Sequence, residues 1–337
     1  MAASIYRSSF MSKHINIIAR TNGVGLDSDA SLLQTALEAA GHKVTFSHCR
    51  SKSLASSLFG KLTKKKPEFD ANIFLERTFP AWFDSAAINI LIPNQERYPE
   101  RQLSRLSKID HVFCKSKHAL EIFSKHSEKY KFGCHLTSFT SKDVHLNDEI
   151  PDYNKFFHLA GRSTLKGTDI ILKLWGDNPH WPTLTIVQNK DNAPESVPSN
   201  VTLIAEHLPY AELIKLSNKN GVHLCTSLSE GWGHYIVEAM SAKAVVVTTD
   251  APPMNELITP DRGILVPYSR SEPRHLGTNF YVGEAKLEDS IKSLISLNAA
   301  EKEALGLAGR AWFLRNHQQF LKNIESTFNS IFATTAP

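Results

Sequence analysis

The sequence of 337 residues lacks a long apolar run. No stretch approaches the ~20 consecutive apolar residues that a membrane-spanning helix requires. Residues 1–12 lack the apolar core of a signal peptide, and we expect them to form a loose tail. Hydrophobic residues make up 42% and charged residues 21%, which is typical of a soluble globular protein. The length suits two domains of ordinary size, each with its own core.

Cysteine is scarce, with four residues in the chain. Cys49, Cys114, Cys134 and Cys225 are scattered and do not have the spacing of metal ligands. Each lies in or beside an apolar run, where cysteine behaves as a small buried hydrophobe. A disulfide framework is therefore disfavoured, and we expect a cytoplasmic protein. No cluster of His, Cys and Asp in the sequence indicates a catalytic metal.

A large excess of one charge is also absent, because the net charge is +4. This mild value gives no reason to expect a nucleic-acid partner. One local basic cluster precedes Pro67 and consists of Lys61, Lys64, Lys65 and Lys66. It is interpreted as a solvated loop, with contact to an anionic membrane surface or an anionic acceptor as the alternative.

Strand-like and helix-like patterns alternate through almost the whole chain, which predicts an α/β fold with helices covering parallel sheets. The polar, proline-containing segment 140–154 is the best linker. Two Rossmann-like domains would face each other across a cleft at the carboxyl ends of their sheets. The predicted boundaries are 13–150 for the first domain, 151–312 for the second and 313–337 for a C-terminal helix, within a helical pattern that runs from 284 to 331.

The most informative segment contains two carboxylates, Glu230 and Glu238, placed eight positions apart around Gly231 and Gly233. An apolar run precedes it, and residues 235–242 suit a helix. Such a junction directs backbone N–H groups and the positive end of a helix at one spot, as phosphate sites do. Glycines let a diphosphate approach the backbone closely. With acids nearby to accept hydrogen bonds from hydroxyls, the segment suits a nucleotide-sugar; a capped helix with two solvated glutamates is the alternative.

A second segment, 156–167, ends a predicted strand at Gly161 and continues with Arg162 and Lys166 before a helix. Arg162 offers a planar fork and Lys166 a compact charge, which suit a diphosphate. In a transfer reaction these cations would neutralise the negative charge that develops on the leaving group. A basic loop without function is the alternative.

Together, these two segments resemble the Glu-x7-Glu motif and the Arg and Lys pair of the retaining, nucleotide-sugar-dependent glycosyltransferases of the GT-B fold, the glycosyltransferase group 1 family. Pro252, Pro253 and Glu256, which follow an apolar run, also fit this family. The resemblance implies a GT-B fold with an acceptor-side first domain and a second domain that binds the nucleotide-sugar. It also implies that the last helix crosses back onto the first domain.

The resemblance further implies that a UDP- or GDP-sugar binds without a metal or other cofactor, and that the acceptor is a glycan, a lipid-linked compound or another hydroxyl compound. Glu238 would bind ribose, Glu230 would orient the donor sugar, and Glu206 would lie near the nucleobase. His234 would contact phosphate or the sugar, or would turn to solvent. The predicted donor-binding residues are Gly23, Gly25, Arg162, Lys166, Glu206, Gly231, Gly233, His234, Tyr235 and Glu238.

The glycine loop after the first predicted strand invites a dinucleotide interpretation. Ser28 replaces the third glycine of that pattern, and no acid ends the second strand, so a nicotinamide or flavin enzyme is disfavoured. The resemblance instead places Gly23 and Gly25 opposite the transferred sugar, with a plain tight turn as the alternative. Asp27 and Asp29 have the spacing of the metal-binding Asp-x-Asp pattern. They precede a helix that is predicted at about 30–40, and acids at the start of a helix are favoured as caps.

In the first domain, Asn94, Gln95 and Glu96 follow a predicted strand that points into the cleft. Many members of the resembled family carry a histidine near this place. Asn94 or Gln95 would hydrogen-bond with the donor sugar, and a general base at Glu96 is the weaker hypothesis. A loop that contacts only the acceptor is the alternative. The predicted catalytic residues are therefore Glu230, Asn94 and Gln95.

The resemblance implies a retaining glycosyltransferase in glycan or polysaccharide synthesis, with peripheral contact at the inner membrane face as an option. A nucleotide-sugar epimerase of the same fold is one alternative, and a non-catalytic nucleotide-sugar-binding module is another.

Overall fold

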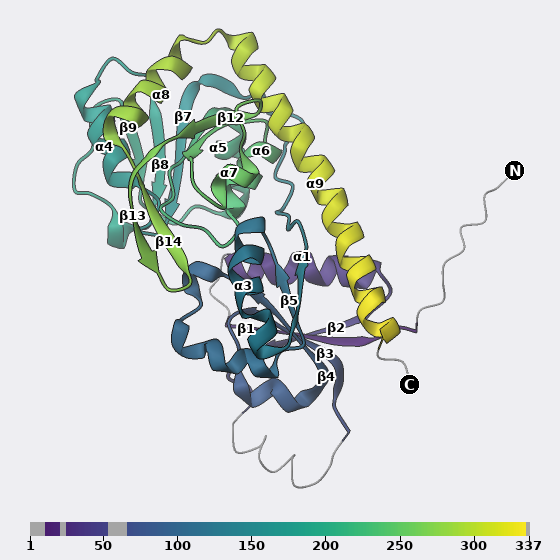
Figure 1. The fold of residues 1–337 in the computed structure, drawn as a ribbon. Helices are drawn as coiled ribbons and strands as arrows, with labels where there is room; N and C mark the ends of the chain where they lie inside the picture. Colours follow the sequence, from purple (N-terminus) through teal and green to yellow (C-terminus); the bar gives the residue numbers. More distant parts are fainter. Residues whose placement is uncertain (1–10, 21–24, 53–65, 335–337) are drawn as a thin grey trace, which may run out of the picture.

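The computed structural model describes residues 11–20, 25–52 and 66–334. Two six-stranded sheets form the body of the protein, and every strand pairing within them is parallel (Figure 1). The predicted α/β fold with two parallel sheets is thus confirmed. None of the helices in the described ranges is both long and apolar enough to cross a bilayer.

The first sheet has the strand order β2-β1-β3-β4-β5-β6. Its elements are β1 (His14–Ala19), α1 (Gly25–Ala39), β2 (Lys43–His48), β3 (Phe69–Glu76), η1 (Pro80–Ser85), β4 (Ala86–Pro93), η2 (Gln95–Arg97), η3 (Glu100–Lys108), β5 (His111–Cys114), α3 (Lys117–Tyr130) and β6 (Gly133–Leu136).

The second sheet has the strand order β12-β11-β10-β7-β8-β9, and a separate two-stranded hairpin, β13-β14, follows it. The elements are β7 (Asp152–Gly161), α4 (Thr168–Asp177), β8 (Leu184–Gln188), η4 (Lys190–Asn192), β9 (Val201–Ile204), α5 (Tyr210–Lys219), β10 (Asn220–Cys225), α6 (His234–Ser241), β11 (Val245–Thr249), α7 (Met254–Leu257), β12 (Gly263–Val266), β13 (Tyr268–Arg274), β14 (Gly277–Val282), α8 (Glu284–Ser296) and α9 (Ala299–Thr334).

Each sheet order reverses at one place, between β1 and β3 in the first sheet and between β7 and β10 in the second. In open α/β sheets ligands bind at such a switch point, outside the carboxyl ends of the strands. The two segments singled out from the sequence directly follow β7 and β10. The topology therefore brings them to one edge of the second sheet.

Helix α9 extends from the second sheet to the first (Figure 1). Phe320 of this helix packs edge-on against Phe139 with ring centroids 5.1 Å apart, and Phe328 packs against Phe113 at 5.4 Å. These aromatic side chains belong to one buried apolar cluster that includes residues of α1, α6 and both sheets. Burial of apolar area on this scale holds the two halves together.

The segment predicted as a linker is fixed to the second domain. Asn218 donates to the carbonyl of Val144 at 2.8 Å, and the amide of Val144 donates to Ser241 Oγ at 3.0 Å. Asp143 forms a bidentate ion pair with Arg310 of α9, at 2.5 and 2.8 Å. The polarity of segment 140–154 thus reflects the hydrogen bonds that it forms with other elements.

Two predicted elements were wrong in detail, and one element of the structure was not predicted. Helix α1 begins at Gly25, five residues before the predicted start, so Gly25 belongs to the helix and not to the predicted glycine loop. The helical pattern from 284 to 331 is two helices, and the second begins at a reciprocal cap in which Asn298 and Glu301 each accept from the other's amide. The hairpin β13-β14 was not predicted at all.

Candidate active site

The carboxylate of Glu230 lies in the loop between β10 and α6. It accepts hydrogen bonds from Lys166 Nζ and from Ser227 Oγ, each at 2.6 Å. The ammonium of Lys166 also lies 3.4 Å from the centroid of the Tyr235 ring, a cation–π contact. Lys166, Glu230 and Tyr235 were all predicted site residues, and the fold brings them into direct contact.

Helix α6 begins beside this group of side chains. Its N-cap is Gly233, whose φ of +101° lies in the left-handed region that favours glycine. No side chain caps the helix, so Gly233 leaves the first amides of α6 uncovered by a capping oxygen. The positive end of a helix next to a lysine is a suitable place for a phosphate group.

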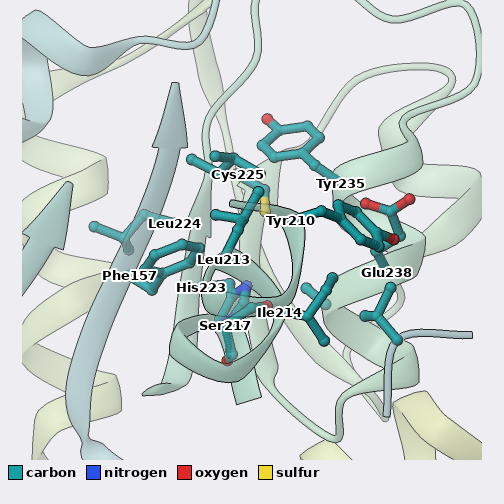
Figure 2. Close-up of a pocket in the computed structure, with 13 residues that line it drawn as sticks. Phe157, Tyr210, Leu213, Ile214, Ser217, His223, Leu224, Cys225, Tyr235 and Glu238 are labelled. Atoms are coloured by element: carbon teal, nitrogen blue, oxygen red, sulfur yellow. The ribbon is translucent and has the colours of Figure 1, made fainter. Parts of the chain in front are cut away.

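Glu238 lies one turn further along α6. It borders a cavity of about 40 Å³ between β7, β10, α5 and α6, and Tyr210 lines this cavity on the same side as Glu238 (Figure 2). The pKa of Glu238 is raised by burial, and the charges of His234, Lys142 and Lys166 offset only part of this rise. A carboxyl group in this position is suited to accept hydrogen bonds from a diol.

Other predicted donor-binding residues make fewer contacts. Arg162 is exposed in the loop after β7, and its carbonyl accepts from Asn192 at 3.1 Å. Glu206 is exposed after β9, and within the described ranges no side chain bonds to it. Gly25 is the first residue of α1. Gly23 lies outside the described residues.

The first domain contributes a buried ion pair that the sequence analysis missed. Lys115 Nζ lies 2.5 Å from Asp29 Oδ2 and 2.9 Å from Asn94 Oδ1, and only 2% of the Lys115 side chain and 3% of the Asp29 side chain are exposed. Burial raises the pKa of Asp29, but Lys115 and a hydrogen bond from His234 outweigh it and give a lowered pKa. The prediction that Asp29 is a helix cap was therefore wrong.

His234 connects the two domains. Its Nε2 lies 2.8 Å from Asp29 Oδ1, and its Nδ1 lies 2.9 Å from Ser141 Oγ. Both ring nitrogens are thus bonded to protein groups, so the predicted alternative in which the side chain turns to solvent was wrong. Contact between this imidazole and phosphate would require one of these bonds to break.

Gln95 and Asn94 face the same loop from the first domain. Gln95 Nε2 donates to the carbonyl of Glu230 at 2.8 Å. Gly231 lies so close to Asn94 that a Cβ on the glycine would be 2.4 Å from Asn94 Oδ1. A side chain at position 231 would push the domains apart, which explains the glycine there.

Glu96 is buried beside these residues, with 7% of its surface exposed. Its Oε2 has no hydrogen-bond partner in the described part of the chain. Burial raises the pKa of Glu96 to about 7; the charge of Glu230 adds to the rise, and those of Lys115 and Arg97 oppose it. A carboxyl group with this pKa can both hold and release a proton near neutral pH.

A signal for Lys115 was present in the sequence. It directly follows the apolar run that forms β5, as Asn94 follows β4. The carboxyl ends of parallel strands meet at one edge of a sheet, so both residues belong to the set of cleft candidates. Asp29 had no comparable signal, because only the packing of α1 against the sheet places it there.

Comparison with known families gives one match. Residues 190–274 match the family model described as glycosyl transferases group 1. The matched range includes both Glu230 and Glu238, whereas Arg162 and Lys166 precede it. Over these residues, about a quarter of its length, the chain is similar to the group 1 glycosyltransferases. The predicted enzyme class, a glycosyltransferase, is thereby confirmed.

Solved structures share the whole fold of this glycosyltransferase. Sucrose-phosphate synthase from Thermosynechococcus elongatus has a TM-score of 0.70 at 14% identity, covering 96% of this chain and 100% of that one. A glycosyltransferase from Rickettsia africae ESF-5 has a TM-score of 0.69 at 14% identity, with 96% and 99% covered. HepE from Anabaena, in complex with UDP and glucose, has a TM-score of 0.67 at 14% identity, with 96% and 100% covered. These likenesses confirm the predicted GT-B fold. No curated protein sequence matches the chain.

Proposed function

We propose that this glycosyltransferase is a retaining enzyme that moves a sugar from a nucleoside-diphosphate-sugar to an acceptor hydroxyl. The observation that carries the proposal is the Lys166–Glu230 pair at 2.6 Å, placed beside the uncapped start of α6 at the switch point between β7 and β10. A cation and helix amides suit the diphosphate, and Glu230 suits the hydroxyls of the sugar.

In this proposal the donor is a UDP- or GDP-sugar and no metal takes part. The solved structure of Anabaena HepE contains UDP and glucose, which supports a uridine donor among the choices. Lys166, Arg162 and the amides near Gly233 hold the diphosphate, and Glu238 binds the ribose. Gln95 fixes the backbone of Glu230, and the carboxylate of Glu230 orients the sugar.

The acceptor hydroxyl attacks the face from which the diphosphate leaves, and a phosphate oxygen takes the proton of that hydroxyl. We place the enzyme in cytoplasmic glycan or polysaccharide synthesis, with a glycan, a lipid-linked compound or another hydroxyl compound as acceptor. The basic cluster before Pro67 was interpreted as a solvated loop, with membrane contact as an alternative, and three of its four lysines, Lys61, Lys64 and Lys65, lie outside the described residues.

Release of nucleoside diphosphate from a panel of uridine, guanosine and adenosine diphosphate sugars tests the proposal. The unaltered chain should release diphosphate from at least one donor, faster when an acceptor is present. Glu230→Gln should lower this rate about 100-fold or more, because one developing interaction in the transition state is lost. Glu195→Gln, an exposed site outside the proposed pocket, is the control. Equal rates for the two variants would contradict the proposal.

A nucleotide-sugar epimerase is a second candidate, and Glu96 is the observation that favours it. An epimerase needs an acid or base in the first domain, and the buried Glu96, with its pKa near 7, supplies one. The two functions differ in a simple measurement: an epimerase changes the sugar of the intact donor when no acceptor is present. Appearance of an isomeric nucleotide-sugar would favour it, and diphosphate release that depends on an acceptor would exclude it.

A further inference from the structure

A basic groove of about 520 Å³ opens between the first domain and the tip of the hairpin β13-β14. We define it by its lining: Arg77, Arg97, Pro99, Glu100, Arg101, Pro273 and His275. Three guanidinium groups thus face one lining carboxylate. Within the described ranges, no carboxylate forms a salt bridge with Arg97 or Arg101. Arg97 and Arg101 therefore give the groove positive charge that no salt bridge among the described residues compensates, whereas Arg77 is paired with Glu76.

The backbone at the end of β3 is strained in a way that directs Arg77 into this groove. The amide of Arg77 donates to the carbonyl of Leu75 at 2.8 Å, which makes a tight turn around Glu76, whose φ is +68°. Positive φ is costly for a residue with a side chain, and such strain is concentrated at functional sites. Glu76 holds one end of the Arg77 guanidinium at 2.7 Å, and Nε of Arg77 is buried without a hydrogen-bond partner among the described residues.

The hairpin connects the basic groove to the proposed reaction centre. At its tip, the amide of Leu276 donates to the carbonyl of Gln95 at 3.2 Å. Along β14, the amide of Phe280 donates to the carbonyl of Leu228 at 2.7 Å, and Asn279 accepts from Ser229 at 2.9 Å. In Figure 1 the hairpin projects from the second domain toward the first. The groove therefore lies close to the loop that carries Glu230, on the side of the first domain.

We propose that the basic groove binds a phosphate group carried by the acceptor, either a phosphorylated sugar or the headgroup of a phospholipid. Arginine forks match the oxygens of phosphate, and several of them together bind it with charge-assisted hydrogen bonds. The groove is larger than a phosphate alone, so it has room for part of the ring or chain that bears it. The inference that the groove binds phosphate depends only on the geometry of the groove. The inference that this phosphate belongs to the acceptor depends also on the proposed function.

Binding of inorganic phosphate is the first measurement, followed through the arginine Nε–Hε signals in NMR with UDP present at saturation. Phosphate should shift these signals in the unaltered chain. Arg97→Gln/Arg101→Gln should weaken the affinity at least about tenfold, because two charge-assisted contacts are lost. Arg315→Gln/Lys322→Gln removes the same charge from exposed positions on α9 and should leave the affinity unchanged. Thermal unfolding of each variant shows that it is folded.

Two further experiments distinguish a phosphorylated sugar from a phospholipid headgroup as the carrier of the phosphate. Tighter binding of glucose 6-phosphate than of inorganic phosphate, with no binding of glucose, indicates a soluble acceptor. Sedimentation with vesicles of phosphatidic acid, but not with phosphatidylcholine alone, indicates a lipid acceptor. If both organic phosphates bind no better than inorganic phosphate, the acceptor assignment is overturned. Absence of any shift with phosphate, or equal weakening in the two double variants, overturns the site itself. Diphosphate release from donors is recorded separately, so failure of the proposed function is recognised independently.

Discussion

The two sides of the interface between the domains are built in different ways. On the side of the second domain, Glu230 and Tyr235 come from one short stretch of chain, and Lys166 comes from the neighbouring strand end. On the side of the first domain, Asp29, Asn94 and Lys115 come from a helix and two separate strand ends. A contiguous stretch can be recognised as a motif, whereas a dispersed set becomes visible only when the fold is known.

The two sides also differ in their electrostatics. Lys166 and Glu230 are each 16% exposed, so water still screens their interaction. Asp29 and Lys115 are almost fully buried, so each depends on the other for compensation of its charge. Lys166 and Glu230 are therefore suited to exchange their mutual contact for contacts with a ligand. Asp29 and Lys115 are suited to act as a fixed support.

The largest effect is expected at the buried pair. Lys115→Ala leaves Asp29 charged and buried with the hydrogen bond to His234 but without its lysine, and should lower the free energy of unfolding by about 3–5 kcal/mol. Urea denaturation measures this change. Lys117→Ala, at an exposed position two residues further on, should change it by less than about 0.5 kcal/mol. A similar small loss for Lys115→Ala would show that Asp29 is solvated or neutral, and would remove the contrast between the two sides.

The next effect concerns pH and Glu96. Because the folded pKa of about 7 exceeds the ordinary value of 4.5, the unfolded chain loses this proton first as pH rises. The stabilisation from Glu96 is therefore complete below about pH 4.5 and is lost as pH rises through about 7, a change of about 3 kcal/mol. Glu96→Gln should remove this part of the pH dependence in urea denaturation at pH 5 and pH 8. An unchanged slope would place the Glu96 carboxyl in contact with water.

A smaller effect is expected where the two sides touch. Gly231→Ala would place a Cβ against Asn94 and should cost about 1–3 kcal/mol. Gly176→Ala is the matched control, because it meets only an ordinary contact with Pro198 and lies in α4, where alanine should stabilise by about 0.5–1 kcal/mol. Thermal unfolding compares them. If both variants gain stability, the close approach of the domains at Gly231 is not present in solution.

The smallest effect is expected at the outer edge of the interface. Glu256 of α7 accepts hydrogen bonds from the amides of Lys117 and His118, at 2.7 and 2.8 Å, and so caps α3 of the other domain. Glu256→Ala should lower the free energy of unfolding by about 1 kcal/mol. Asp289→Ala, at an exposed position in α8, should leave it nearly unchanged. No difference between them in urea denaturation would mean that solvent replaces this cap without cost.

Sequence patterns predicted the parts of the molecule that depend on local chemistry. Alternating apolar runs predicted two parallel sheets, and the glycines and glutamates of 227–240 predicted a phosphate-suited junction where β10 meets α6. They did not predict the pairing of Asp29 with Lys115, because those residues are 86 positions apart and meet only through tertiary packing. The hairpin β13-β14 was missed because its outward strand is exposed and polar, without the apolar alternation that marks a half-buried strand.

A crystal structure of the chain with a bound nucleotide-sugar, chosen as the donor that releases diphosphate fastest, shows whether the junction of β10 and α6 holds the donor. We expect the diphosphate to lie at the start of α6 beside Lys166, with the sugar within hydrogen-bond distance of the Glu230 carboxylate. A diphosphate bound on the first domain, or a sugar that points away from Glu230, would contradict it.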